Sequence, residues 1–321
     1  MISANLNMQS SYFQHTLKDS FTCIGTGLHT GLKVIMTVMP ADANTGYRFV
    51  RRDVLHNYKE VLAAWHTVSD TRLCITVSNH MGVRVSTIEH LIAALHASGI
   101  DNARIILDSP EVPIMDGSAL PFIELIDSVG RIRQSAERKV ILIKKTVSVE
   151  DEGKHACLLP SPEPWIDMLV DFDTSWIGEQ RLTTPISRKI FREELANART
   201  FGFAEQIETL QKMGFARGGS LDRAILVDKT GVVNEGGLRH GDEFVRHKVL
   251  DCVGDLALCG AYIVGCYSAS YPGHRLNNQL VRALMCDENA FEFITARQAN
   301  TQYSSSIEFL KNENEISENA S

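Results

Sequence analysis

The feature that most constrains the fold is an order of elements that occurs twice along the chain. Each half contains a helix with an apolar helical period, then a short β-branched or aromatic strand, then a second helix. The segments are 86–99, 103–107 and 119–129 in the first half, and 242–260, 261–270 and 276–285 in the second half. Further strand-like segments precede both units. We therefore expect an α+β fold made of a duplicated unit whose helices cover one face of its strands.

Two domains account for the length of the chain, 321 residues, better than one. The polar stretch between the halves predicts a linker at 131–139, which leaves a first domain at 1–130 and a second at 140–302. The second domain also contains an additional segment near 201–233 that begins with a helical pattern. The polar segment 303–321 predicts a frayed tail.

Charge and composition exclude several classes of protein. A formal net charge of −7 argues against a general nucleic-acid binder, which normally carries a basic stripe. No run of 18 apolar residues occurs, so we expect no transmembrane segment, and the N-terminal residues lack the apolar core of a secretory signal. The seven cysteines form no CxxC pair and predict reduced, buried thiols. A cytoplasmic monomer is the expectation.

The helix predicted over 242–260 carries an unusual polar stripe. His247 and Asp251 are four residues apart, so their side chains can meet on one metal ion. Lys248 and Asp255 fall within the same arc of the helix. An imidazole and a carboxylate are acceptable zinc ligands. The alternative interpretation is a solvated charged face with helical ion pairs.

The candidate third ligand is His90, in the segment STIEH (86–90). His90 lies near a helix start in the first half, the place that His247 has in the second half. If the halves pack about a pseudo-symmetry axis, His90, His247 and Asp251 form a three-ligand site with a fourth position open to water, as in catalytic zinc sites. Glu89 is then placed as general base. The alternative for this segment is a capping box.

His274 stands in a Pro-Gly-His turn (272–274) that opens the last predicted helix. Asp255 is its expected partner. A nearby carboxylate favours the imidazolium form, which can stabilise an oxyanion or protonate a leaving amine. The alternative is an ordinary capping or surface histidine.

Six motifs occur in one order over nearly the whole chain, from about residue 14 to residue 283. They are TGLHTG (26–31), STIEHL (86–91), PIMDGSALPF (113–122), ARTFGF (198–203), DEFVRHKVLDCVGDL (242–256) and GHRLNN (273–278). Together they resemble the UDP-3-O-acyl-N-acetylglucosamine deacetylases, the zinc enzymes of lipid A synthesis. The resemblance implies two similar α+β domains in a layered sandwich, with helices packed between two sheets and one insert per domain. It also implies that the insert near 201–233 forms a hydrophobic passage for an acyl chain.

The resemblance implies a role for each of the candidate residues. His90, His247 and Asp251 correspond to the zinc ligands, with one Zn²⁺ per chain and Fe²⁺ as the alternative metal, and Glu89 corresponds to the general base. His274 corresponds to the electrostatic stabiliser or general acid, with Asp255 as its partner. The remaining implied contacts are Thr200 for the oxyanion and Lys248, Phe201 and Phe203 for the substrate.

One departure from the family pattern concerns the nucleotide. Many members have a lysine near the Gly-His turn where this chain has Tyr271, and alanine where it has Arg275. We hypothesise that Arg275 contacts the diphosphate instead. His29, in TGLHTG, is expected to be a hydrogen-bonded turn residue and not a ligand, and Asp116 is expected to fix backbone groups in a turn.

The activity that the resemblance implies is hydrolysis of the N-acetyl group of UDP-3-O-acyl-N-acetylglucosamine, a UDP-linked acylated amino sugar. This is an early committed step of lipid A biosynthesis, carried out in the cytoplasm near the inner membrane surface of a Gram-negative bacterium. Two alternatives stay open. One is a zinc hydrolase of the same fold with a different N-acyl substrate. The other is a non-catalytic carbohydrate- or nucleotide-binding protein with His247 and Asp251 as surface charges.

Overall fold

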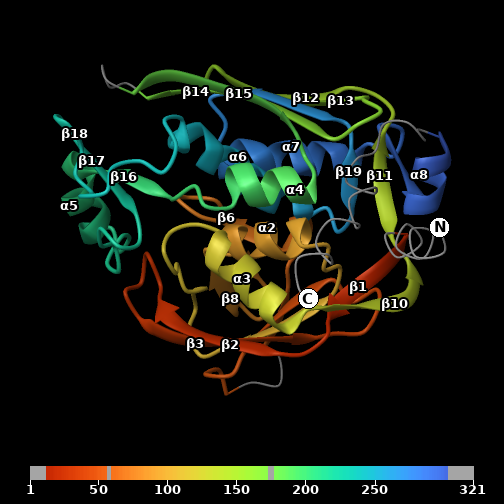
Figure 1. Cartoon of the computed structure of the whole chain (residues 1–321), viewed down its shortest axis with the longest axis horizontal. Coiled ribbons are helices and arrows are strands. Elements are labelled where there is room, and N and C mark those ends of the chain that lie inside the picture. Colours follow the sequence, from red (N-terminus) through yellow and green to blue (C-terminus); the bar gives the residue numbers. More distant parts are fainter. Residues whose placement is uncertain (1–11, 56–58, 173–176, 303–321) are drawn as a thin grey trace, which may run out of the picture.

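A computed structural model of the chain describes residues 12–55, 59–172 and 177–302. The predicted tail at 303–321 lies outside the described residues. Two five-stranded sheets form the outer layers, and the main helices lie between them (Figure 1). This arrangement confirms the predicted α+β sandwich.

The two large sheets have the same topology. The first has the order β2-β3-β9-β4-β5 and the second the order β12-β13-β20-β14-β15. The first sheet comprises β2 (Phe21–Thr26), β3 (Lys33–Pro40), β9 (Ala103–Leu107), β4 (Tyr47–Arg51) and β5 (Glu60–Leu62). The second comprises β12 (Val147–Asp151), β13 (Lys154–Leu159), β20 (Cys266–Ser270), β14 (Trp165–Phe172) and β15 (Gly178–Pro185). In both, the last strand in sequence takes the central position, antiparallel to one neighbour and parallel to the other. The predicted duplication is therefore confirmed.

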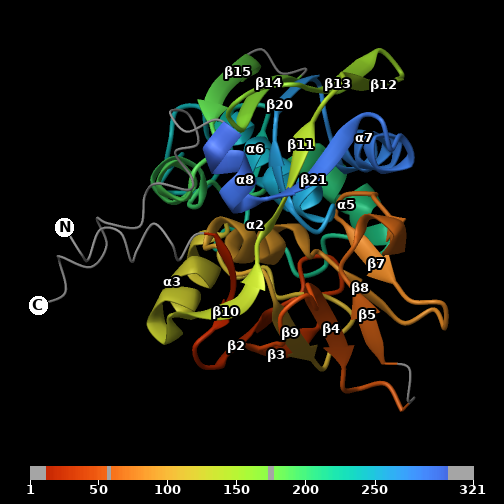
Figure 2. The same cartoon turned by 90° about the vertical axis from the view of Figure 1, so that its right-hand side faces the viewer.

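The helices follow the predicted order with small differences in their ends. In the first half these are α2 (Glu89–Ala97) and α3 (Leu120–Val129), and in the second α6 (Glu243–Ala257) and α7 (His274–Cys286). Helix α6 is shorter than the predicted 242–260, and α7 begins two residues before the predicted 276. Helix α2 packs against α6 at the centre of the molecule (Figures 1 and 2).

Each half carries an insert between its fifth strand and its first long helix. The first insert is a three-stranded sheet of β6 (Val68–Asp70), β7 (Thr76–Ser78) and β8 (Arg84–Ser86), preceded by a short turn of helix, η1 (Trp65–Thr67). The second is a three-stranded sheet of β16 (Phe201–Phe203), β17 (Ile225–Asp228) and β18 (Gly231–Val232), with helix α5 (Ala204–Lys212). A short helix, α4 (Arg188–Ile190) running into η2 (Phe191–Leu195), precedes this insert.

The predicted linker at 131–139 is not an irregular connection. Most of it is β10 (Arg131–Glu137), which pairs with β1 (Phe13–Leu17), and the chain continues directly into β11 (Lys139–Ile143). Strand β11 lies between β19 (Tyr262–Val264) and β21 (Phe291–Thr295). Helix α8 (Ala296–Gln302) follows β21 in the chain. Figure 2 shows β10 and β11 running from one layer to the other. The exact division into domains stays a prediction.

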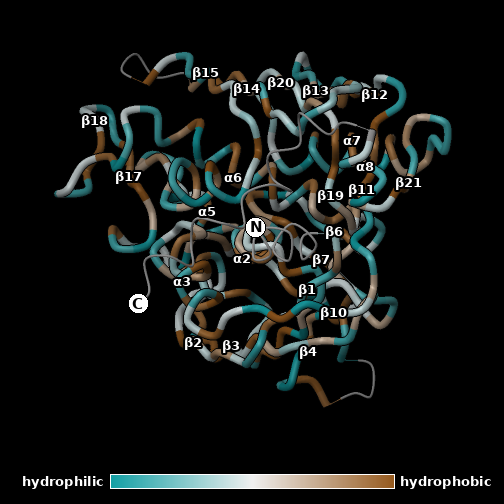
Figure 3. Tube along the Cα trace, turned by 45° about the vertical axis from the view of Figure 1, so that its right-hand side comes forward, coloured by the Kyte–Doolittle hydropathy of each residue, from teal (hydrophilic) through white to brown (hydrophobic). Residues whose placement is uncertain are grey.

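The core follows from the alternation of side chains along the strands. In β3, for example, Val34, Met36 and Val38 are buried while Lys33 and Ile35 are exposed, as a strand with one solvated face requires. Figure 3 shows hydrophobic and hydrophilic stretches mixed along these strands. All seven cysteines are free thiols, but the prediction that they are buried is wrong for Cys286, which is exposed. Among the described residues, no helix has both the length and the apolar character needed to cross a bilayer.

Candidate active site

The candidate site forms where α2 and α6 pack against each other. The contact is close because α6 has a glycine at this point: a Cβ on Gly254 would overlap the backbone carbonyl of Glu89, the first residue of α2. The packing places the start of α2 beside the middle of α6. It thereby brings His90 to the stripe that carries His247 and Asp251.

His90, His247 and Asp251 form a buried cluster. Nε2 of His90 lies 3.4 Å from Oδ1 of Asp251, and Nε2 of His247 lies 3.3 Å from the same oxygen. The two imidazole rings are 4.9 Å apart at an angle of 85°. One nitrogen or oxygen atom from each residue lies within 4.8 Å of the others. The sequence-based hypothesis therefore describes a set of side chains that the fold does bring together.

The chemistry of these donors fits a divalent metal ion. Oδ1 of Asp251 is buried without a hydrogen-bond partner, which is rare for a carboxylate oxygen in a protein interior. Nδ1 of His247 donates to the carbonyl of Ala198 at 3.0 Å, so the lone pair of Nε2 faces the cluster. Burial lowers the pKa of His247 to about 4, against the opposing charge of Asp251. The neutral imidazole that results is the form that binds metals.

Glu89 and His274 lie on one side of this cluster. Oε2 of Glu89 accepts a hydrogen bond from the backbone N–H of Ile75 at 3.0 Å, and Oε1 lies 3.8 Å from Nε2 of His274. Burial raises the pKa of Glu89, although the neighbouring His274 and His90 oppose the shift. Nε2 of His274 also lies 4.0 Å from Oδ2 of Asp251. The Glu89 carboxyl group and the His274 imidazole, which differ in proton affinity, thus both lie beside the three-residue cluster.

Asp255 holds His274 in place. Nδ1 of His274 lies 2.9 Å from Oδ2 of Asp255, which also accepts a hydrogen bond from Nδ2 of Asn277 at 2.8 Å. The Tyr267 hydroxyl donates in turn to Oδ1 of Asn277 at 2.6 Å. Burial alone would lower the pKa of His274, but Asp255 and the other nearby carboxylates raise it to about 9. The carboxylates around His274 therefore favour its imidazolium form.

Asn277 and Tyr267 were not among the residues singled out from the sequence. Asn277 is three residues after His274, on the same face of α7, so the helical spacing was a usable signal. Tyr267 comes from β20 and carried no local signal, because only the fold places a strand residue beside this helix.

The structure contradicts the three alternative interpretations, which were a capping box at Glu89, a solvated charged face on α6 and a surface histidine at position 274. The capping box fails because Ser86 ends β8, and α2 begins at Glu89 without any side-chain cap. The solvated charged face fails because His247 and Asp251 are buried. His274 is also buried, so it is not an ordinary surface residue.

Lys248 and Phe201 lie beside the cluster. Nζ of Lys248 contacts Oδ2 of Asp251 at 2.9 Å and lies 5.7 Å from the centre of the Phe201 ring. The Phe201 ring contacts those of Phe203 and Phe244, with centres 6.2 and 5.0 Å apart. These contacts join the cluster to the second insert.

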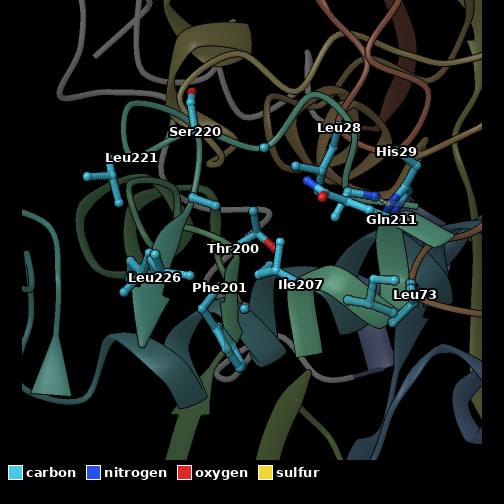
Figure 4. A pocket seen from close by; sticks show the side chains of 16 residues that line it. Leu28, His29, Leu73, Thr200, Phe201, Ile207, Gln211, Ser220, Leu221 and Leu226 are labelled. Atoms are coloured by element: carbon cyan, nitrogen blue, oxygen red, sulfur yellow. Dashed lines mark hydrogen bonds between the residues drawn. The ribbon is translucent and has the colours of Figure 1, made fainter. Parts of the chain in front are cut away.

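An apolar cavity of about 250 Å³ has Thr200 and Phe201 among the residues that line it. Its walls come mainly from the second insert, with Leu28, His29 and Leu73 contributed by the first half. Figure 4 shows His29 and Leu73 on one side and Leu221 and Leu226 on the other. The segment near 201–233 therefore lines a cavity that adjoins the cluster.

Two other sequence hypotheses concern residues farther from the cluster. Arg275 is largely exposed, and its Nε pairs with Oδ2 of Asp151 at 3.0 Å, not with any residue of the cluster. Tyr271, four residues before Arg275, is exposed and has a left-handed backbone, with φ of 59°. Asp116 accepts hydrogen bonds from Ser118 within its turn, as its sequence context predicts.

The sequence matches known proteins over most of its length. A family profile described as LpxC, UDP-3-O-acyl N-acetylglycosamine deacetylase, matches residues 14–286. A UDP-3-O-acyl-N-acetylglucosamine deacetylase of Phenylobacterium zucineum is 45% identical over 283 residues, which are 88% of this chain and 97% of that protein. The protein of the same name from Pasteurella multocida is 46% identical over 284 residues, 88% of this chain and 93% of that protein. The chain therefore belongs to the UDP-3-O-acyl N-acetylglycosamine deacetylase family.

Proposed function

We propose that this protein hydrolyses the N-acetyl group of UDP-3-O-acyl-N-acetylglucosamine in lipid A biosynthesis, giving acetate and UDP-3-O-acyl-glucosamine. The observation that carries the proposal is the buried cluster of His90, His247 and Asp251 with Glu89 and His274 at its side. The names of the relatives supply the substrate. The cytoplasmic location and the monomeric state stay predictions.

Zinc is the metal that we assign to the cluster, with Fe²⁺ as the alternative. Two imidazoles and one carboxylate match the number and the types of protein ligands in catalytic zinc sites. When bound, the ion would act as a Lewis acid that polarises the acetyl carbonyl, and it would lower the pKa of a bound water to about 7. His90, His247 and Asp251 would hold it.

Glu89 is the proposed general base. The backbone N–H of Ile75 holds Oε2, which leaves Oε1 facing His274 and the cluster. In this position Oε1 can take a proton from the attacking water. The raised pKa of Glu89 brings its proton affinity closer to neutral pH, where a general base is most effective.

His274 is the proposed cation that stabilises the oxyanion, and the leaving amine takes its proton from Glu89 or from His274. Asp255 fixes Nδ1, so the proton on Nε2 points between Glu89 and Asp251. A donor in a fixed position needs no reorganisation as charge develops on the carbonyl oxygen. We assign the hydroxyl of Thr200, which also lines the cavity, as a second donor.

The substrate contacts follow from what surrounds these groups. The apolar cavity takes the acyl chain, and Phe201, Phe203 and Lys248 contact the sugar and the start of that chain. Arg275 stays our candidate for the diphosphate. Its guanidinium group is largely exposed, pairs with Asp151 at the surface and is therefore accessible to an anionic ligand.

Acetate release after metal removal tests the proposal. Protein treated with a chelator is expected to release no acetate from UDP-3-O-acyl-N-acetylglucosamine, and addition of zinc at one equivalent per chain is expected to restore release. UDP-N-acetylglucosamine without the acyl chain should be a poorer substrate, because the cavity is then empty. Folded, zinc-loaded protein that releases no acetate from the acylated substrate would refute the function.

A further inference from the structure

The interior of the first half contains a carboxylate that the proposed mechanism does not use. Glu111 is fully buried, and its two oxygens accept four hydrogen bonds. The donors are the backbone N–H groups of His29 and Thr30 and the hydroxyls of Thr30 and Thr87, at 2.7–2.8 Å. Burial of a carboxylate costs free energy that uncharged donors offset only in part, which favours a positional role over a stabilising one.

The side chain of Glu111 joins two segments that are far apart in the sequence. Oε2 accepts from the N–H and the hydroxyl of Thr30, in the turn between β2 and β3. The approach to this turn is close, because a Cβ on Gly27 would overlap Oε2. Oε1 accepts from the hydroxyl of Thr87, in the connection between β8 and α2. The carboxylate therefore links the turn at 27–31 to the segment that leads into α2.

The main chain on either side of Glu111 is fixed as well. The N–H of Ser86, the last residue of β8, donates to the carbonyl of Pro110 at 2.9 Å. The N–H of Val112 donates in turn to the carbonyl of Ser86 at 3.0 Å. The Glu111 backbone is thus held beside the end of β8, which fixes the place from which its side chain reaches Thr87.

Thr87 has a backbone conformation that its side chain disfavours. Its φ of 57° lies in the left-handed region, where a β-branched residue is an outlier. Such a conformation is unfavourable and persists only where the surrounding structure holds it. Thr87 is buried, and its hydroxyl donates to Oε1 of Glu111 at 2.8 Å, with the Cys74 thiol as a second, weaker neighbour. The bond to Glu111 therefore helps to hold this turn.

The turn at Thr87 determines how α2 begins. The first residue of this helix is Glu89, the proposed general base, and the second is His90, a proposed metal ligand. No side chain caps the start of the helix, so the direction in which α2 leaves β8 depends on the preceding turn. A change in that turn would move Glu89 and His90 together relative to α6.

We propose that Glu111 is a positioning residue for the deacetylation. By holding the hydroxyl of Thr87, it fixes the left-handed turn that directs Glu89 and His90 toward the cluster. Glu111 acts through Thr87 and not on the substrate. The inference rests on the proposed function, since it names how the same site is assembled.

Two threonine variants test the proposal, because each removes one hydroxyl bond to the same carboxylate. Thr87→Val removes the bond on the α2 side, and Thr30→Val removes the bond on the opposite side. With UDP-3-O-acyl-N-acetylglucosamine, zinc-saturated Thr87→Val should lose about 10²-fold in kcat with little change in KM, as for a displacement of about 1 Å at a reacting group. Thr30→Val should keep a kcat close to that of the wild type. Thr87→Ser, which retains the hydroxyl, should recover most of the lost kcat.

Zinc affinity gives a second readout that does not depend on activity. In competition with a chelator, Thr87→Val should bind zinc about 10–100-fold more weakly than the wild type, as when the support behind a metal ligand is lost. Thr30→Val should bind zinc with nearly wild-type affinity.

Glu111→Gln tests the same bond from its other end and serves where Thr87→Val does not fold. It keeps the size of the side chain but replaces one acceptor oxygen by an NH₂ group, so kcat and zinc affinity should both fall. Addition of Thr87→Val to this variant should cause little further loss, because the two changes remove one shared interaction.

Three outcomes would overturn the role of Glu111. They are a Thr87→Val protein with wild-type kcat and zinc affinity, equal losses in Thr87→Val and Thr30→Val, and a double variant in which the losses of the two single variants multiply. In each case the wild-type protein still releases acetate, so the deacetylase function stands. If the zinc-loaded wild-type protein releases no acetate, the proposed function fails, and the zinc affinities alone decide the role of Glu111.

Discussion

At the scale of single residues, Asp251 joins the candidate metal cluster to its surroundings. Its Oδ1 faces both imidazoles, while its Oδ2 accepts from Lys248 at 2.9 Å. Burial would raise the pKa of Asp251, but the histidines and Lys248 around it hold that pKa well below its usual range. The carboxylate is therefore ionised, as a metal ligand must be.

Replacement of His274 separates catalysis from metal binding. His274→Ala removes the cationic donor but none of the three proposed ligands, so kcat should fall by about 10²–10⁴ while the zinc content stays near that of the wild type. Acetate release and metal analysis on the same preparation measure both. Loss of zinc in this variant would contradict the assigned role and place His274 among the ligands.

Helical spacing was enough to predict that His247 and Asp251 share one face. The pairing of His274 with Asp255 was also expected, from the charged stripe. Glu111 was not predicted, because its four hydrogen bonds come from Thr30, His29 and Thr87, which are far from it in sequence. Only the fold brings those donors to one carboxylate.

At the scale of elements, the site depends on how closely α6 approaches α2. The contact places the Gly254 Cα against the backbone of Glu89. Helix interiors disfavour glycine by about 1 kcal/mol relative to alanine, so this glycine is explained by the close approach and not by helix stability.

Gly254→Ala tests this packing. The added methyl group would overlap the Glu89 carbonyl, so the helices must separate, and the free energy of unfolding should fall by about 1–3 kcal/mol despite the better helix propensity. Zinc content should fall as well, because His90 moves relative to Asp251. Denaturant unfolding and metal analysis measure these effects.

Gly236→Ala is the matched control, because a Cβ at Gly236 meets no atom within 4 Å. Equal stability and zinc content in Gly254→Ala and Gly236→Ala would show that close approach of α6 is not required.

The long helices were predicted well because their apolar period and glycine stops are local signals. The short strands of the first insert were not predicted. Strands β6, β7 and β8 are three residues each, too short for an alternating pattern to be recognised. Strand β10 was read as a linker because its partner, β1, lies more than a hundred residues earlier in the chain, and pairing partners leave no trace in local composition.

At the scale of the whole molecule, Arg138 connects the two halves. Its side chain is 2% exposed, and the guanidinium group pairs with both oxygens of Asp101, at 2.9 and 2.8 Å, just after α2. It also donates to the carbonyl of Gly99 at 3.0 Å and lies 5.1 Å from the centre of the Tyr262 ring in β19. A buried arginine that bonds to Asp101 and packs on Tyr262 contacts both halves of the molecule at this junction.

Removal of this arginine should destabilise the protein. Arg138→Ala leaves the Asp101 carboxylate partly buried without its cation, so the free energy of unfolding should fall by about 3–5 kcal/mol. Arg104→Ala, on the exposed face of β9, should change it by no more than about 0.5 kcal/mol. Denaturant unfolding measures the free energy of unfolding of both variants. Similar losses in Arg138→Ala and Arg104→Ala would show that Arg138 does not hold the halves together.

Metal analysis of the His90→Ala protein tests the central claim most directly, because His90 comes from one half and His247 and Asp251 come from the other. The wild-type protein is expected to purify with about one zinc per chain. His90→Ala should lose that zinc, and His155→Ala, on the exposed part of β13, should keep it. Full retention of zinc by His90→Ala would contradict the three-ligand site at the junction of α2 and α6.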